Sequence, residues 1–330
     1  MRIAVLGDGG WGTALAILLV GNGHNVTLWG PFPDYLDQMT RERANSRFLP
    51  GVPLPAGLAF ASEVAVAVEG AELIVLATPV PYMRAMLGKL AATGAAQRAG
   101  LINVAKGIEI GSLLRPQELG RELLGLTRWA TLSGPSHAEE VARGIPTAVV
   151  AASTDAHLAI AVQAAFMGGF FRVYTSPDVV GVELGGALKN IFAVAAGICD
   201  GMGFGDNSKA ALMTRGIAEM ARLGEALGGS AQTFAGLSGV GDLIVTCISR
   251  HSRNRHVGEE LGRGVALPEI QKAMGLSVAE GVKTVVSAHE LAGRLNVSTP
   301  IIGEVYTTLY EGKDPKQAAR DLMTRAARPE

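Results

Sequence analysis

A glycine cluster that directly follows a short apolar run constrains this chain more than any other feature. Residues 2–6 (RIAVL) predict a buried strand, and residues 11–23 (WGTALAILLVGNG) predict a helix. Between them, Gly7, Gly9 and Gly12 fit the spacing G-x-G-x-x-G. Glycines at this spacing permit a tight turn, a close approach of the main chain to a pyrophosphate, and close packing of helix on strand. We therefore predict a dinucleotide-binding loop, with a turn that merely needs positive φ as the plainer alternative.

Short apolar runs recur through the first half of the chain, with room for a helix or loop between them. They occupy residues 2–7, 25–30, 58–62, 72–79, 101–107, 129–135, 147–153 and 171–176. Unbroken apolar strands separated by helical patterns predict a parallel sheet that is covered on both faces.

The pattern changes near residue 176. Beyond it the apolar runs lengthen and take helical spacing, and residues 176–178 (SPD) predict a helix N-cap with a proline at the start. A chain of 330 residues is also long for a single core. We expect an α/β domain with a doubly wound sheet over residues 1–178, followed by an all-helical domain over residues 179–330.

Charge and cysteine content exclude several classes of protein. The net charge is −1, from 29 basic and 30 acidic side chains, which gives no reason to expect nucleic acid or an anionic membrane as a partner. Cys199 and Cys247 lie in apolar stretches, with no CxxC pair and no neighbouring metal ligands. The apolar run before Gly7 is too short for a signal peptide, and the longer runs carry polar interruptions. These features predict a cytoplasmic protein without a membrane span or a metal site.

The tip of the second predicted strand normally distinguishes NAD from NADP. An acidic residue there accepts the ribose hydroxyls of NAD, whereas an arginine meets the phosphate of NADP. In this chain Gly30 and Pro31 stand at the tip, and Asp34 and Arg41 lie further along. The spacing therefore leaves the choice between NAD(H) and NADP(H) open.

Lys189 is the most unusual candidate for chemistry, because it lies in the apolar helical pattern ELGGALKNIFAVAAG. A charged amine there is costly unless it is paired or functional. Burial and a second cation would lower its pKa toward the range where it can pass a proton near neutrality. The alternative is a lysine whose stem covers apolar surface while its ammonium reaches solvent.

Other polar residues follow predicted strands, at the edge where doubly wound folds bind ligands. Lys106 stands in NVAKG, and Gly134 and Ser136 stand in LSGPSHAEEVA before a helix. A solvated lysine and an ordinary turn with an N-cap are the alternative interpretations.

A basic stretch, SRHSRNR, precedes a helix that we predict over residues 256–264 (HVGEELGRG). Its arginines, Arg250, Arg253 and Arg255, suit a small phosphate or carboxylate, and a solvated basic loop is the alternative. Asp242, ahead of a hydrophobic run, is either a helix N-cap or a carboxylate that orients a catalytic lysine.

Seven segments together resemble the bacterial NAD(P)-dependent sn-glycerol-3-phosphate dehydrogenases, in order and at family spacing from residue 1 to about residue 315. They are GDGGWGTALA, FLPGVPLP, NVAKGIE, SGPSHAEEVA, VELGGALKNIFAVAAGICDGMGFGDNSKAALMTRGIAEM, GLSGVGDLIVTCISRHSRNRHVGEELGRG and VAEGVKT. The resemblance implies hydride transfer between a nicotinamide and dihydroxyacetone phosphate, giving sn-glycerol 3-phosphate for phospholipid synthesis. It also implies a Rossmann-like domain, a helical substrate domain and a homodimer.

The resemblance also implies roles for individual residues. Lys189 would be the proton donor and acceptor, with Lys106 and Asp242 completing the catalytic set. The substrate-binding positions would be Lys106, Gly134, Ser136, Lys189, Asn190, Asp242, Ser252, Arg253 and Asn254. The cofactor-binding positions would be Gly7, Gly9, Gly10, Trp11, Gly12, Pro31, Lys106, Ala138, Arg253, Val278 and Glu280.

Two positions depart from the family pattern. Gly10 stands where the family commonly has serine, and Pro31 stands where an arginine or histidine often meets the adenosine ribose or its phosphate. The second departure weakens the case for strict NADPH use. Our hypothesis is that both cofactors are used, or that NADH is favoured.

Two other functions remain as alternatives. The β-hydroxyacid dehydrogenases also join a nucleotide-binding domain to a helical domain with a Lys-Asn pair, but SRNR and NVAKGIE favour a phosphate substrate. A cofactor-sensing regulatory protein without turnover is disfavoured by the presence of Lys106, Lys189 and Asp242 together.

Overall fold

The chain divides into two compact units in a computed structural model that describes every residue except 126–127, 276–277 and 328–330. The first unit comprises Met1–Lys106 and Leu114–Glu183, and the second comprises Gly107–Leu113 and the residues from Leu184 onward. The predicted limits of the domains at residues 178 and 179 stay a prediction, because compactness alone does not show where an independently folding domain ends.

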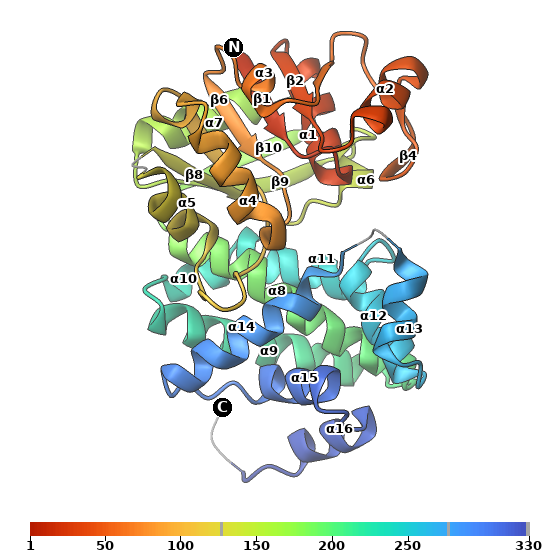
Figure 1. The fold of residues 1–330 in the computed structure, drawn as a ribbon. Helices are drawn as coiled ribbons and strands as arrows, with labels where there is room; N and C mark the ends of the chain where they lie inside the picture. The colour runs from red at the N-terminus through yellow and green to blue at the C-terminus, as the bar shows by residue number, and fades with distance from the viewer. Residues whose placement is uncertain (126–127, 276–277, 328–330) are drawn as a thin grey trace. The chain divides into compact units, whose positions relative to one another are not determined.

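An eight-stranded sheet forms the centre of the first unit, in the order β10-β9-β8-β7-β6-β1-β2-β5 (Figure 1). Its strands are β1 (Arg2–Leu6), β2 (Asn25–Trp29), β5 (Ala59–Ala61), β6 (Leu73–Leu76), β7 (Gly100–Asn103), β8 (Trp129–Ser133), β9 (Thr147–Ala152) and β10 (Phe171–Ser176). Each of the eight apolar runs in the sequence supplies one of these strands, which confirms the α/β class.

The expectation of a fully parallel sheet is wrong at one pair. Strands β8 and β9 are antiparallel, with Thr131 opposite Ala152, whereas every other neighbouring pair in the sheet is parallel. A parallel neighbour needs a crossover that runs back along the sheet, usually a helix. The connection from β8 to β9 contains only the four-residue helix α6 (Ala138–Val141), which is too short for that return. Apolar runs alone cannot reveal this difference.

Helices cover both faces of the sheet, as predicted. On one face α1 (Gly10–Gly21), α2 (Pro33–Glu42) and α7 (Ala156–Phe166) join one hydrophobic core. On the other face α3 (Val64–Ala67), α4 (Val80–Ala91) and α5 (Pro116–Leu124) join a second. The two cores are separate because the side chains of β1 alternate: Ile3 and Val5 enter the first core, and Ala4 and Leu6 enter the second.

A small hairpin that the sequence did not predict lies beside the glycine loop. Its strands are β3 (Ala44–Asn45) and β4 (Leu49–Pro53), which pair antiparallel. The buried Asn45 amide donates to Asp8 O at 2.8 Å and to Thr13 Oγ1 at 2.7 Å. The hairpin therefore fixes the backbone of the loop between β1 and α1.

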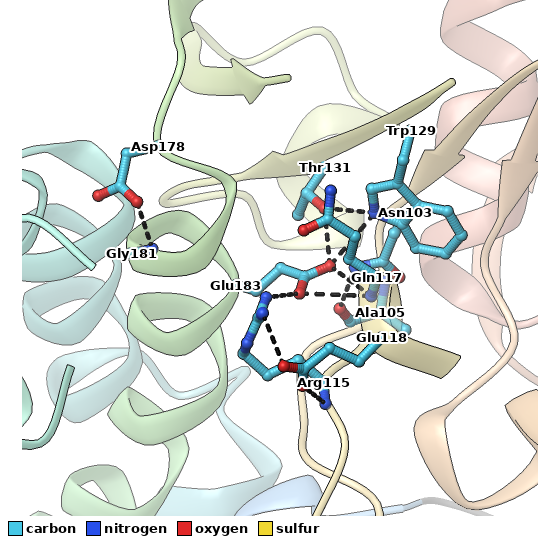
Figure 2. Close-up of polar contacts among 10 residues, drawn as sticks. All are labelled: Asn103, Ala105, Arg115, Gln117, Glu118, Trp129, Thr131, Asp178, Gly181 and Glu183. Atoms are coloured by element: carbon cyan, nitrogen blue, oxygen red, sulfur yellow. Dashed lines mark hydrogen bonds and ion pairs between the residues drawn. The ribbon is translucent and has the colours of Figure 1, made fainter. Parts of the chain in front are cut away.

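A buried carboxylate, Glu183, ties together several elements of the first unit (Figure 2). Its Oε2 lies 2.8 Å from a guanidinium nitrogen of Arg115. Its Oε1 accepts hydrogen bonds from Thr131 Oγ1 at 2.9 Å and from the backbone N–H of Gln117 at 3.1 Å. Burial raises the pKa of Glu183, and the Arg115 guanidinium opposes that shift. The start of α5 and strand β8 are thus joined through one side chain.

The second unit is helical throughout residues 184–275 and 278–327, wherever it has regular structure, as predicted. Helix α8 (Val179–Gly201) begins in the first unit and continues into the second, and Asp178 caps it by accepting from the N–H of Gly181 at 2.8 Å. The others are α9 (Asp206–Ala226), α10 (Ala231–Phe234), a π-helical turn η2 (Leu237–Gly241), α11 (Asp242–Ile248), α12 (Arg253–Gly262), α13 (Leu267–Met274), α14 (Glu280–Arg294), α15 (Pro300–Tyr310) and α16 (Pro315–Met323).

Helices α8 and α12 make backbone contact through facing glycines. A Cβ atom on Gly197 of α8 would overlap the carbonyl oxygen of Arg255, and one on Gly258 of α12 would overlap that of Val194. Only glycine permits this approach. The approach holds the first turn of α12 next to the middle of α8.

Two segments are long and apolar enough to cross a membrane by composition alone. They are Val179–Gly201, whose apolar window is 94% buried, and Ala231–Ile248, whose window is 39% buried. The burial of α8 is that of a core helix, so its composition is weak evidence for a membrane span.

Glu219 makes the stability of the second unit depend on pH. Its buried carboxylate accepts from the N–H groups of Ile301 at 2.8 Å and of Ile302 at 3.2 Å, at the start of α15. Burial raises its pKa from 4.5 to about 7, against the lowering effect of those hydrogen bonds. The folded state therefore holds a proton that the unfolded state releases between these values. We expect the free energy of unfolding to fall, by up to about 3 kcal/mol, as the pH rises from 4.5 to 7.

Urea unfolding of the wild type and of Glu219→Gln at several pH values measures this effect. The neutral amide keeps one acceptor oxygen for these N–H groups and does not titrate, so the variant should lose most of the pH dependence. Glu269→Gln is the matched control, since Glu269 lies exposed in the first turn of α13. Equal pH slopes for the wild type and Glu219→Gln would show that Glu219 is not the titrating group.

Candidate active site

The glycine loop has the geometry that the sequence predicts. Gly7 has φ 139°, and its N–H donates to Trp29 O at 3.0 Å, which closes the turn against β2. A Cβ atom on Gly12 would overlap the carbonyl oxygen of Gly7, so α1 packs directly on the end of β1. A Cβ atom on Gly9 would meet no atom within 4 Å, so this side of the loop is open. The start of α1 has no side-chain cap, which suits an anion at its N–H groups.

The structure explains why residue 10 is glycine. A Cβ atom on Gly10 would lie 2.6 Å from Phe48 O, in the turn of the β3–β4 hairpin, and 3.8 Å from the Cβ of Ala138. A serine at position 10 would require this turn to move. The departure from the family pattern is therefore coupled to a hairpin that packs closely on the loop.

Two buried polar atoms beside the loop have no hydrogen-bond partner among the residues that the structure describes. They are the Nε1 of Trp11 and the Oδ2 of Asp8. Trp11 packs against Leu49 and Val52, so its ring is held between α1 and the hairpin. Buried polar groups are normally satisfied, and unsatisfied ones beside an open glycine loop indicate a ligand. The residues present therefore fit a bound dinucleotide.

Lys106, Gly134 and Ser136 meet at the carboxyl edge of the sheet. Lys106 follows β7, and its ammonium donates to Gly134 O at 3.1 Å. The Ser136 hydroxyl donates to the same oxygen at 3.0 Å. Gly134 has φ 145°, and a Cβ there would lie 3.0 Å from the Cα of Val149.

Pro31 is exposed just beyond the end of β2.

Lys189 is buried and paired. The alternative in which its ammonium reaches solvent is therefore wrong. Only 6% of the residue is exposed. Its ammonium donates to Thr246 Oγ1 at 2.6 Å and lies 2.9 Å from Asp242 Oδ1. Asp242, 1% exposed, is the first residue within α11, and Gly241 occupies the N-cap position. The interpretation of Asp242 as an N-cap is wrong.

Thr246 is a member of this cluster that the sequence interpretation missed. Its hydroxyl donates to Asp242 O at 2.6 Å, four residues earlier on α11, while it accepts from Lys189. Residues four apart on a helix lie on the same face, so the spacing from Asp242 to Thr246 was the available signal.

A second polar group joins three helices next to Lys189. The amide of Asn254 donates to Asn190 Oδ1 at 2.9 Å and accepts from the N–H of Gly281 at 2.8 Å. The amide of Asn190 donates to Glu280 Oε2 at 3.5 Å. The starts of α12 and α14 are thus fixed against α8, and the predicted residues Asn190, Asn254 and Glu280 lie together. Val278 precedes α14 outside any helix or strand.

The three arginines of the basic stretch have different surroundings in the structure. Helix α12 begins at Arg253 rather than at residue 256, because Ser252 caps it by accepting from the N–H of Arg255 at 3.2 Å. Arg255 turns to acidic partners, with its Nε 2.6 Å from Asp200 Oδ2 and a guanidinium nitrogen 3.4 Å from Glu259. Arg250 and Arg253 are exposed, so only they remain available to a ligand.

No group of three or more His, Cys, Asp or Glu side chains with metal-binding geometry occurs in the described part of the chain. Cys199 and Cys247 are free thiols. Burial raises the pKa of Cys247 to about 12, so it stays protonated near neutral pH.

Two family models match nearly the whole chain. The model of the NAD-dependent glycerol-3-phosphate dehydrogenase N-terminus matches residues 2–159, and the model of the C-terminus of the same enzymes matches residues 178–320. The chain belongs to this family.

Individual family members match over their full length. The glycerol-3-phosphate dehydrogenase [NAD(P)+] of Chlorobium luteolum is 50% identical over 333 residues, covering 100% of this chain and 99% of its own. The protein of that name from Geobacillus kaustophilus is 49% identical over 332 residues, covering 100% and 96%. The crystal structure of glycerol-3-phosphate dehydrogenase from Coxiella burnetii, 38% identical, covers 98% of this chain and 99% of its own with a TM-score of 0.94.

Proposed function

We propose that the chain interconverts dihydroxyacetone phosphate and sn-glycerol 3-phosphate by NAD(P)-dependent hydride transfer. The observation that carries the proposal is the buried Lys189–Asp242–Thr246 cluster on α8 and α11. It lies one residue from the Asn190–Asn254 pair, in a chain that also bears an open dinucleotide loop. Relatives named for this activity match the chain from end to end.

The chemistry follows from the cluster. A nicotinamide bound at the glycine loop would supply or accept the hydride at the substrate carbon. When a ketone is reduced, negative charge develops on its oxygen, and an adjacent ammonium both stabilises that charge and protonates the oxygen. We assign this role to Lys189, while Asp242 and Thr246 hold its Nζ in place. In the reverse direction the neutral amine takes the hydroxyl proton as the hydride leaves the carbon.

The substrate contacts that we propose fall on two sets of residues. In the second unit, the N-terminus of α12 with Ser252, Arg253 and Asn254 would bind the phosphate, supported by the helix start and by the exposed guanidinium of Arg253. In the first unit, Lys106, Gly134 and Ser136 would contact the substrate.

The cofactor contacts that we propose come from the glycine loop and from residues further along the chain. They are Gly7, Gly9, Gly10, Trp11, Gly12, Pro31, Lys106, Ala138, Arg253, Val278 and Glu280. The orphaned Nε1 of Trp11 and the open side of Gly9 support the first group. We further propose a cytoplasmic homodimer that supplies phospholipid synthesis, on the basis of the family resemblance.

Parallel assays with NADH and with NADPH test the reaction, the substrate and the cofactor together. We expect oxidation of either reduced nicotinamide on addition of dihydroxyacetone phosphate, with kcat/KM for NADH at least equal to that for NADPH. Small 3-hydroxy acids with NAD⁺ should give no turnover. Activity on such acids alone would support the β-hydroxyacid dehydrogenase alternative. Tight nucleotide binding without turnover would support a regulatory protein.

A further inference from the structure

The carboxyl group of Asp8 lies at the tip of β2, although the residue belongs to the loop after β1. A Cβ atom on Gly30, the residue after β2, would lie 2.6 Å from Asp8 Cγ and 3.0 Å from Asp8 Cβ. The Asp8 carboxyl group therefore fills the space that a side chain at position 30 would need. An acidic group is thus present at the place where the sequence shows only glycine and proline.

The backbone of Asp8 is held in position, and one oxygen of its carboxyl group has no hydrogen-bond partner among the residues that the structure describes. Asp8 O accepts from Asn45 Nδ2 at 2.8 Å and from Thr13 Oγ1 at 3.3 Å, which fixes the backbone. Only 6% of the residue is exposed, and its Oδ2 has no hydrogen-bond partner in the described part of the protein. Burial raises the pKa of Asp8 more than a backbone hydrogen bond and the charge of Arg47 lower it, so a further donor at Oδ2 would stabilise the charged form.

We propose that Asp8 is the residue that selects the cofactor, by accepting hydrogen bonds from the adenosine ribose hydroxyls of NAD(H) and repelling the 2′-phosphate of NADP(H). The proposal rests on the proposed function only in assuming that a nicotinamide dinucleotide binds at the glycine loop. In nucleotide-binding folds of this type an acidic residue at the tip of the second strand makes these contacts. Here the carboxyl group reaches the same place from the preceding loop, and Gly30 makes room for it.

Two other charged side chains bear on this preference. Asp34 is exposed in the first turn of α2, close in sequence to the tip of β2. Arg47, whose guanidinium lies 4.2 Å from the centre of the Tyr35 ring, partly opposes the pKa rise of Asp8. Asp34 differs from Asp8 in being solvated, so its charge is screened and its hydrogen bonds compete with water. The buried residue should therefore have the larger effect.

Direct binding measurements test the proposal without any substrate. We would measure Kd for NADH and for NADPH by fluorescence titration in the wild type, Asp8→Asn, Asp8→Ala and the control Asp34→Asn. We expect the wild type to favour NADH, and Asp8→Asn to shift the ratio of the two Kd values at least tenfold toward NADPH. Asp8→Ala should weaken NADH binding and also lose the discrimination. Asp34→Asn should leave the ratio within about twofold of the wild type.

Other outcomes would overturn the proposal. These are an unchanged Kd ratio in both Asp8 variants, or a shift confined to Asp34→Asn. Thermal melting identifies an Asp8 variant that fails to fold, in which case the other Asp8 variant gives the answer. Because binding is measured without dihydroxyacetone phosphate, failure of this proposal remains distinguishable from absence of the proposed activity.

Discussion

Lys189→Ala should lower kcat by a factor of 10² to 10⁴ while the Kd for NADH stays close to that of the wild type. This is the range that general acid–base catalysis ordinarily contributes. The ammonium is buried on α8 with Asp242 2.9 Å away and Thr246 2.6 Å away, so its removal takes the proposed proton donor out of the cluster. Lys189 is not among the cofactor contacts that we propose, and the glycine loop belongs to the other compact unit, so nucleotide binding should persist. Single-turnover and steady-state rates, with a fluorescence titration of NADH, measure both quantities.

The controls for this prediction separate chemistry from folding. Removing Lys189 leaves the Asp242 carboxylate buried without its cation, which itself costs stability. The double variant Lys189→Met/Asp242→Asn removes both charges and should recover much of that stability but none of the activity. Lys272→Ala, at an exposed lysine on α13, should behave as the wild type. A near-normal kcat in Lys189→Ala would remove Lys189 from the mechanism.

The fold was predictable where one local pattern determines the outcome. The eight apolar runs became the eight strands of the sheet because a strand buried on both faces must be apolar throughout. The direction of β9 was not predictable, since strand direction depends on the length of the connection and on what it packs against. The hairpin β3–β4 was missed because β3 has only two residues, and β4 carries Pro50 and Pro53 and shows no alternation of apolar and polar residues.

The sequence indicates which residues belong to the site but not which of them pair with one another. Lys189 stood out because an amine in an apolar helix needs an explanation, and the structure supplies Asp242, 53 positions later in the chain, as its partner. The arginines of SRNR looked equivalent in the sequence, yet Arg255 pairs with Asp200 of α8. The role that we propose for Asp8 depends on the approach of its carboxyl group to Gly30. Asp8 follows β1, whereas Gly30 follows the neighbouring strand β2. Each of these pairings is a long-range contact that no local spacing encodes.

Buried and exposed ion pairs in the first unit should differ sharply in what they contribute to stability. Glu183 is 4% exposed and joins Arg115 to the polar atoms of β8 and the start of α5 (Figure 2). Glu122 pairs with Arg84 at 2.6 Å, but both of these side chains are more than one-third exposed. Glu183→Ala leaves a buried guanidinium without its partner, so we expect a loss of about 3–5 kcal/mol in the free energy of unfolding. Glu122→Ala should cost less than about 1 kcal/mol.

Urea unfolding of both variants and of Arg115→Met/Glu183→Leu tests the argument about Glu183. Because the double variant removes both buried charges, it should recover most of the stability that Glu183→Ala loses. Equal losses for Glu183→Ala and Glu122→Ala would mean that the buried pair contributes no more than a surface pair. A double variant as unstable as Glu183→Ala would instead assign the loss to the hydrogen bonds from Thr131 and the backbone of Gln117, which leucine cannot accept. The two results thus separate the charge of Glu183 from its role as an acceptor that joins β8 to α5.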